Sequence, residues 1–346
     1  MPDRQAVLSA LGAVQDPELH RDIVSLGMVR ELAVEGGRVS FELVLTTPAC
    51  PLRETIDRDV RAALAGVPGI DEIELRWGAE VRGAAAREGG PKPVAGVKNV
   101  IAVASNKGGV GKSTVATNLA VALAQLGASV GIVDADITGP NLPTMLGIEQ
   151  GALAEGREGL RAIEAHGVRA VSIGFVLPKG TPVVWRGPMI GSGVRQLLHD
   201  VDWGELDYLI VDLPPGTSDA SMSMAQDALI AGVVIVSTPQ RVAIEDATKA
   251  VGMFDRMGVP IFGIVENMSS EIFGRGGARA AAEELGIEFL GELELNAAIR
   301  EGADNGVPVV VGAPDSAAAH AFIRLAEQVA ARCSVLRYAS DMGAVA

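Results

Sequence analysis

The sequence predicts an α/β fold with a mainly parallel sheet covered by helices on both faces, preceded by a small α+β domain. Two observations on the 346 residues lead to this prediction. After residue 97, short runs of Val, Ile, Leu and Ala alternate with helical stretches, which is typical of parallel strands buried on both faces. A glycine-rich loop at residues 106–112 follows the first of these strands, at the sheet edge where such folds place their ligands.

The region before residue 83 and the region after residue 97 carry different patterns. In the first region we expect helices over Asp3–Val14 and Leu52–Ala65 and strands over Met28–Val34, Arg38–Leu45 and Ile70–Arg76. In the second region we expect strands at Val100–Ala104, Ser129–Val133, Ala170–Ile173, Leu209–Leu213, Val233–Ser237 and Ile261–Val265, separated by helices.

The segment 83–97 is rich in Gly, Ala and Pro and has no period that would bury one face, so we interpret it as a linker. A chain of 346 residues is long enough for two domains. We therefore expect a small α+β domain over residues 1–82, a larger domain over residues 98–335 and a frayed tail over residues 336–346.

Composition limits the classes of function. The net charge of −14 argues against nucleic acid or an anionic membrane as the main partner, because those partners need clustered Lys and Arg. Residues 1–20 contain no apolar run of the signal-peptide type, and the longest apolar stretch, Ala228–Val236, is too short to span a bilayer. We therefore expect a cytoplasmic protein without a nucleic-acid or membrane partner. Its two cysteines exclude a disulfide framework within one chain.

The glycine-rich loop has the chemistry of a phosphate-binding loop, which makes the expected fold that of a P-loop NTPase. Its glycines let successive N–H donors and the start of the next helix point at phosphate oxygens. Lys112 is expected to contact the β- and γ-phosphates and Ser113 to bind Mg²⁺. Asn106 replaces the first glycine of the ordinary pattern, and asparagine tolerates positive φ. We expect ATP to lie against Asn106, Lys107, Gly108, Gly109, Val110, Gly111, Lys112, Ser113 and Thr114.

Acidic residues follow two other strands of the expected sheet. Asp134 and Asp136 end the second strand and Asp212 ends the fourth, so all three reach the edge that holds the loop. Asp212 is expected to hold a metal-bound water while Ser113 coordinates Mg²⁺ directly. A single strand-end aspartate is more often a cap or turn residue, but here two suitable strands coincide with the loop. Near Gly216, a backbone N–H is placed to sense the γ-phosphate.

Asn267 ends the sixth expected strand, in the sequence Glu-Asn-Met. At that position its amide is placed to hydrogen-bond the edge of an adenine base. The alternative is an ordinary turn residue, which is the commoner role of an asparagine after a strand.

The loop Lys-Gly-Gly-Val-Gly-Lys-Ser resembles the deviant Walker A motif of the MinD, ParA and nitrogenase-iron-protein ATPases. In that class the extra lysine reaches across a dimer interface. The resemblance implies that Lys107 acts catalytically on the phosphates of a partner subunit in a homodimer. It also implies that Asp136 orients or deprotonates the attacking water and that Asp134 supports the magnesium shell.

Over roughly residues 1–335 the chain resembles the Mrp/ApbC-type ATPases linked to iron–sulfur cluster assembly and transfer. In the small domain, Asp16-Pro17-Glu18, Leu26-Gly27 and Thr46–Pro51 resemble a domain found in other cluster-assembly factors. The resemblance implies a nucleotide-gated, slowly ATP-hydrolysing dimer that assists binding and transfer of clusters to apoproteins or works with assembly factors. It rests mainly on Lys107–Thr114, Asp134–Pro143, Trp185–Met189, Asp212–Asp219, Glu266–Ser269 and Ala298–Gly302.

One feature of the family pattern is absent. Family members that carry a cluster usually have Cys-x-x-Cys after Glu-Asn-Met-Ser, so that a dimer supplies four thiolates. Here Ser270-Glu271 runs directly into Ile272-Phe273-Gly274. Cys50 is then the candidate iron–sulfur ligand, because it lies just before an expected helix start that would favour a thiolate. A buried, inert cysteine is the alternative, and Cys333 in the last helix is expected to be a small core or surface residue.

Three further functions stay open at this point. An ATPase of this type can assist cluster assembly without holding a cluster itself. A ParA/MinD-like positioning ATPase would need a basic DNA-binding surface or an amphipathic membrane-targeting helix. A small-molecule ligase on the same fold, such as a dethiobiotin-synthetase-like enzyme, is disfavoured by the Trp-Arg-Gly-Pro-Met segment and by the small domain.

Overall fold

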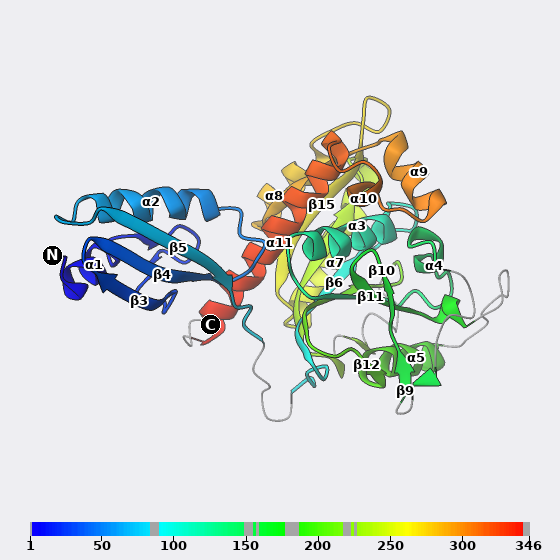
Figure 1. Ribbon diagram of the computed structural model, residues 1–346. Helices are drawn as coiled ribbons and strands as arrows, with labels where there is room; N and C mark the ends of the chain where they lie inside the picture. The colour runs from blue at the N-terminus through cyan, green and yellow to red at the C-terminus, as the bar shows by residue number, and fades with distance from the viewer. Residues whose placement is uncertain are drawn as a thin grey trace. The chain divides into compact units, whose positions relative to one another are not determined.

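The computed structural model describes residues 2–83, 90–148, 155–156, 159–176, 187–216, 223–224 and 227–341. The chain forms two compact units (Figure 1). The small unit contains Met1–Arg82 together with Ala330–Ala346, and the large unit contains Gly83–Val329. Among the described residues, no helix combines the length and the apolarity needed to cross a membrane.

The small unit is built on a three-stranded sheet in the order β3-β4-β5, in which β4 pairs antiparallel with β3 and parallel with β5. Val39, Phe41 and Leu43 alternate along β4 and are fully buried, as expected for a strand with one face on a core. The core also contains apolar residues of both helices. The elements are α1 (Arg4–Leu11), β1 (Gln15–Asp16), β2 (Arg21–Asp22), β3 (Val29–Glu35), β4 (Arg38–Leu45), α2 (Arg53–Ala65) and β5 (Glu72–Ala79).

The large unit is built on an eight-stranded sheet in the order β10-β11-β7-β13-β6-β14-β15-β16. Only the edge strand β10 pairs antiparallel within it. All eight residues of β14 are buried without alternation, which shows that both faces of the sheet are covered. The strands are β6 (Val97–Ala104), β7 (Val130–Asp134), β10 (Ile163–Ala165), β11 (Val168–Ser172), β13 (Leu206–Asp212), β14 (Ile230–Ser237), β15 (Ile261–Ser269) and β16 (Phe289–Glu294).

Helices cover this sheet, and α3, α7 and α8 contact its central and outer strands (Figure 1). A small second sheet is formed by β8 (Glu155–Gly156), β9 (Gly159–Arg161) and β12 (Val201–Asp202). The helices are α3 (Lys112–Gln125), α4 (Leu142–Met145), the 3₁₀ turn η1 (Ile173–Phe175), α5 (Gly187–His199), α7 (Arg241–Arg256), α8 (Gly277–Leu285), α9 (Ala297–Asn305), α10 (Val309–Gly312) and α11 (Ala317–Asp341).

The predicted fold class is confirmed, and the six expected strands are β6, β7, β11, β13, β14 and β15. Two strands at the edges of the sheet, β10 and β16, were not expected. β16 has the sequence Phe-Leu-Gly-Glu-Leu-Glu, whose glycine and acidic residues hide it from a search for continuous apolar runs.

The expected frayed tail over residues 336–346 is wrong for its first part, because α11 continues as a helix to Asp341. Tyr338 packs against the core of the small unit, and the Arg82 guanidinium lies 4.0 Å from the centre of its ring. These contacts join segments far apart in the sequence, so the local pattern did not reveal them.

Candidate nucleotide site at the carboxyl edge of the sheet

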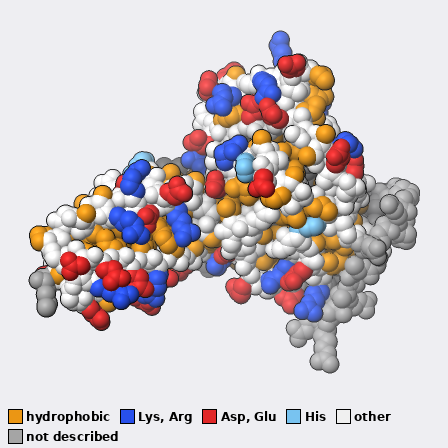
Figure 2. Space-filling model, turned by 45° about the horizontal axis from the view of Figure 1, so that its top comes forward, with side chains coloured by type: hydrophobic (Ala, Val, Ile, Leu, Met, Phe, Trp, Pro, Cys, Tyr) orange, Lys and Arg blue, Asp and Glu red, His pale blue; other side chains and the backbone are white. Residues whose placement is uncertain are grey.

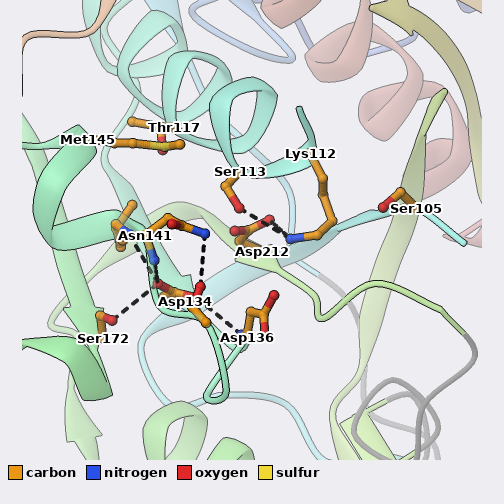
Figure 3. A network of polar contacts seen from close by, with 12 residues as sticks. Ser105, Lys112, Ser113, Thr117, Asp134, Asp136, Asn141, Met145, Ser172 and Asp212 are labelled. Atoms are coloured by element: carbon orange, nitrogen blue, oxygen red, sulfur yellow. Dashed lines mark hydrogen bonds and ion pairs between the residues drawn. The ribbon is translucent and has the colours of Figure 1, made fainter. Parts of the chain in front are cut away.

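The glycine-rich loop joins the end of β6, in the middle of the sheet, to the start of α3 (Figure 3). Gly109 and Gly111 both have φ of 81°, a conformation that favours glycine. A side chain at Gly111 would also clash with the amide nitrogen of Asn267. The sequence therefore needs glycine at this turn for two reasons, and the loop ends with the N–H groups at the start of α3 free to face an anion.

The first half of the loop is open to solvent. Lys107, Gly108 and Gly109 are exposed, and Asn106 is half-buried. The hydroxyl of Ser105 donates a hydrogen bond of 3.0 Å to the carbonyl oxygen of Lys107, which shapes this half of the loop.

Gly216 lies against the same loop, with φ of 87°. Its N–H donates a hydrogen bond of 2.9 Å to the carbonyl oxygen of Ser105. The structure thus brings the expected γ-phosphate sensor to the loop, with its N–H directed at the loop backbone. The rest of that segment, Thr217–Asp219, lies outside the described residues, as do Trp185 and Arg186.

Lys112 forms a buried ion pair with Asp212, with 2.5 Å between Nζ and Oδ1 (Figure 3). The side chains are 6% and 3% exposed. Lys112 Nζ also lies 3.4 Å from the hydroxyl oxygen of Ser113. Burial raises the pKa of Asp212 above its usual range, although the nearby Lys112 opposes this rise. A carboxylate that is buried this deeply is stabilised by a cation.

Asp134 holds the segment that follows β7. Its Oδ2 atom accepts hydrogen bonds from the N–H groups of Asn141 and Leu142, at 3.0 and 3.1 Å, and from the Ser172 hydroxyl at 3.2 Å. Burial raises the pKa of Asp134 to about 7, and the neighbouring Asp212 adds to the rise. Asp134 therefore organises the start of α4, in keeping with a supporting rather than a direct role beside a metal ion.

Asp136 lies at the rim of the site, two residues beyond β7, and is half-buried. Its Oδ1 atom accepts a hydrogen bond of 3.0 Å from the Thr138 hydroxyl. Its own N–H donates to Asp134 Oδ1 at 3.2 Å. The carboxylate is thus oriented by a turn and reaches solvent.

Asn267 is directly joined to the phosphate loop. Its Nδ2 atom donates a hydrogen bond of 2.8 Å to the carbonyl oxygen of Val110. The sequence placed this residue at the correct sheet edge but did not reveal its contact with the loop.

The donor set suits Mg²⁺. Asp212 and the Ser113 hydroxyl would supply hard oxygen ligands, which magnesium prefers, and both lie beside the loop that would present the phosphates. The chemistry that Mg²⁺ would supply is neutralisation of phosphate charge, with Asp134 acting behind the metal ligands.

Neither cysteine belongs to this site. Cys50 is half-buried beside the core of the small unit. Cys333 is buried, as expected for a small core residue, and burial raises the pKa of its thiol to about 12. In the described parts of the chain, no group of three or more His, Cys, Asp and Glu side chains is placed to hold a metal ion.

Sequence reasoning gave no individual role to three polar side chains that support the site. Ser105 and Ser172 are small buried serines at strand ends, which carry no pattern of their own. Glu266 is a fully buried carboxylate at the end of the apolar strand β15. The sequence did contain a signal for it, because an acidic residue directly after the apolar segment Ile-Phe-Gly-Ile-Val needs hydrogen-bond partners once it is buried.

Comparison with known proteins identifies the family. A model of the family described as NUBPL iron-transfer P-loop NTPase matches residues 96–330. The chain belongs to this family. A second model, described as iron-sulfur cluster assembly protein, matches residues 4–75 of the same chain. The resemblance to Mrp/ApbC-type ATPases is thereby confirmed.

Two relatives that match 95% of this chain are named iron-sulfur cluster carrier proteins. The chain is 48% identical to the iron-sulfur cluster carrier protein of Synechocystis sp., over 95% of this chain and 98% of that protein. It is 47% identical to the iron-sulfur cluster carrier protein of Deinococcus radiodurans, over 95% of each chain.

Solved structures agree with the fold of the large unit. The nucleotide-binding protein of Archaeoglobus fulgidus, in complex with ADP, is 40% identical with a TM-score of 0.54 and covers 61% of this chain and 87% of its own. The cell division ATPase MinD of Pyrococcus furiosus is 26% identical, also with a TM-score of 0.54, and covers 67% and 98%. This member of the NUBPL-type family is therefore a P-loop ATPase.

Proposed function

We propose that this chain is a magnesium-dependent ATPase that works as a homodimer and assists the transfer of iron–sulfur clusters to target apoproteins. The observation that carries the proposal is the phosphate loop, which holds one buried lysine paired with Asp212 and one lysine exposed to solvent. Residues 96–330 match an iron-transfer family and residues 4–75 match a cluster-assembly family, which supports an iron–sulfur cluster as the cargo.

The residues of one chain account for nucleotide binding. On binding, Lys112 exchanges its buried partner Asp212 for the phosphates, and the loop N–H groups hold the phosphate oxygens. Asp212, freed of the lysine, then faces the metal side of the site together with Ser113. The remaining oxygen of the Asn267 amide is the atom left to accept a hydrogen bond from an adenine amino group, since its nitrogen donates to the loop.

The two groups that we assign to hydrolysis, Asp136 and Lys107, are not buried in the nucleotide site of this chain. Asp136 is the group that orients the attacking water, since it is a half-buried carboxylate held by Thr138 at the rim. Lys107 is exposed in the first half of the phosphate loop, so it is available to the phosphates bound by a second copy. A charge supplied from a partner stabilises the transition state of phosphoryl transfer.

In this proposal the iron–sulfur cluster is the cargo of the ATPase, and the thiol of Cys50 is one of its ligands. Soft thiolates select iron–sulfur clusters. Of the two cysteines in the sequence, Cys333 is buried and its thiol has a raised pKa. Cys50 is the more accessible one. One thiolate in each chain does not complete a cluster, so the other ligands would come from the second copy or from the client protein.

Anaerobic reconstitution with iron and sulfide tests this assignment. We expect the wild-type chain and Cys333→Ser to bind iron with the absorbance of a cluster, and Cys50→Ser to lose both. Equal iron in Cys50→Ser would contradict the role of Cys50. Iron-free wild type with normal ATP turnover would instead support an ATPase that assists assembly without holding a cluster.

A positioning ATPase of the ParA/MinD type is the second candidate, because the fold of MinD matches. Such proteins need a basic or membrane-binding surface. On the face shown in Figure 2, Lys and Arg side chains are interspersed with Asp and Glu and form no patch of one sign. Together with the net charge of −14 this favours the cluster-transfer role, which we place in the cytoplasm.

A further inference from the structure

The last four residues of β15 leave the regular strand. The pairing of β15 with β16 shifts register between Glu266 and Ser269. Met268 has φ of 60°, which is unusual for a residue with a side chain. A bend of this kind persists only when surrounding contacts hold it.

One side of this bend supports the phosphate loop. Asn267 donates its hydrogen bond of 2.8 Å to the Val110 carbonyl oxygen. A side chain at Gly111 would come within 3.1 Å of the terminal methyl carbon of Met268 and would clash with Asn267. The loop therefore rests directly on these two side chains, and the position of the bend sets the position of the loop.

The other side of the bend is held by Glu266, whose carboxylate is fully buried. Its Oε1 atom accepts hydrogen bonds from the Ser269 hydroxyl at 2.7 Å and from the Gly276 N–H at 2.8 Å. Its Oε2 atom accepts one of 2.7 Å from the N–H of Ala278, in the first turn of α8. The Ser269 hydroxyl and the two N–H groups all donate, so only a side chain with two acceptor oxygens satisfies the three of them.

These bonds also fix the turn at Ser270–Gly276. Ser270 and Gly274 exchange backbone hydrogen bonds of 3.1 and 2.9 Å, and the tip exposes Ile272 to 84% and Phe273 to 37%. On the solvent side, Arg275 pairs with Glu292 and Glu294. The turn is thus held from inside by Glu266 and from outside by Arg275.

We propose that Glu266 is a positioning residue that couples the phosphate loop to the apolar tip of this turn. The same four-residue bend contacts the loop through Asn267 and the turn through Glu266. Nucleotide that tightens the loop therefore tightens the turn, and a fixed turn strengthens nucleotide binding to the same degree, because coupling free energies are reciprocal. The inference rests on the proposed ATP-binding function and adds a second, exposed region whose state depends on it.

A double-mutant cycle on ATP affinity tests the first half of the coupling. Glu266→Gln places an amide nitrogen against the donors, and we expect it to weaken ATP binding about tenfold, as does Asn267→Ala. If Glu266 acts through Asn267, the double variant binds ATP no more weakly than the weaker single variant. Glu74→Gln, which breaks an exposed ion pair with Arg38 in the small unit, is the matched control with unchanged affinity. Additive losses in the cycle would overturn the coupling.

A fluorescent reporter tests the second half. Phe273→Trp places an indole at the tip, and we expect its emission to change when ATP is added, after subtraction of the same titration of the wild type. In Glu266→Gln/Phe273→Trp at saturating ATP the change should disappear. A response that persists there, or no response in Phe273→Trp alone, would overturn the proposal.

Folding and function are separated by two further measurements. Ser269→Ala removes only one of the three bonds to Glu266, so it gives a smaller loss of affinity in the same direction even where Glu266→Gln fails to fold. Wild-type protein that binds no ATP would refute the proposed function and this coupling together. ATP binding by the wild type with additive losses in the cycle would refute the coupling alone.

Discussion

The interior and the rim of the nucleotide site differ in how complete they are. In the interior, Lys112, Asp212 and Asp134 are buried and bonded to one another or to backbone groups of the same chain. At the rim, Lys107 is exposed and Asp136 is half-buried. This difference supports the proposal that one chain binds ATP and that a second copy completes the site for hydrolysis.

The largest effect is expected from a change in the interior. Lys112→Ala removes the lysine that faces both Asp212 and the phosphates, so ATP binding should weaken by at least about a hundredfold and turnover should be lost. Isothermal titration with ATP and Mg²⁺ measures this. Lys249→Ala is the control, since that lysine forms an exposed ion pair with Asp246 on α7. Near-normal ATP affinity in Lys112→Ala would contradict the claim that the buried interior of the site binds the nucleotide.

A change at the rim should separate turnover from binding. Lys107→Ala is expected to lower kcat by about a thousandfold, the scale of a charge supplied from a partner in phosphoryl transfer, while ATP affinity stays within about threefold. Phosphate release at saturating ATP, measured beside the titration, gives both quantities. Full hydrolysis by Lys107→Ala would show that the rim lysine has no catalytic role.

The smallest effect that we expect is on the pH dependence of folding stability, and it arises from the buried carboxyl group of Asp134. The pKa of Asp134 is raised to about 7 in the folded chain, against about 3.9 for an unperturbed aspartate. Between these pH values the folded chain keeps a proton that the unfolded chain releases, so the group lowers stability as pH rises from about 4 to about 7.

Without nucleotide and Mg²⁺, Asp134→Asn should therefore lose less stability than the wild type between pH 5 and pH 7, by up to a few kcal/mol. Urea denaturation at both pH values measures the difference. An equal change in the free energy of unfolding of the two proteins between pH 5 and pH 7 would contradict a raised pKa of Asp134.

The sheet, the phosphate loop and the edge that holds the acidic residues could be predicted from the sequence, because they depend on local patterns. Continuous Val and Ile runs predict buried parallel strands, and Lys107–Thr114 predicts the phosphate loop. The acidic residues could be assigned to the correct edge since parallel strands end together.

What could not be predicted depends on contacts between distant segments. Lys112 and Asp212 are 100 residues apart in the chain, and Ser172 meets Asp134 only because β11 lies beside β7. Helix α11 extends to Asp341 where a tail was expected, since Tyr338 finds its partners in the small unit. The bend at Glu266 likewise depends on α8, which follows later in the chain.

Mixing two inactive variants tests whether a second copy of the chain completes the ATP site. If Lys107 acts on the phosphates of a second copy, Lys112→Ala supplies the missing lysine to a Lys107→Ala subunit that still binds ATP. The mixture should then hydrolyse ATP at a substantial fraction of the wild-type rate, although each variant alone does not. A mixture as inactive as its components, under conditions in which the two variants form a mixed dimer, would contradict an ATP site completed by a second copy of the chain.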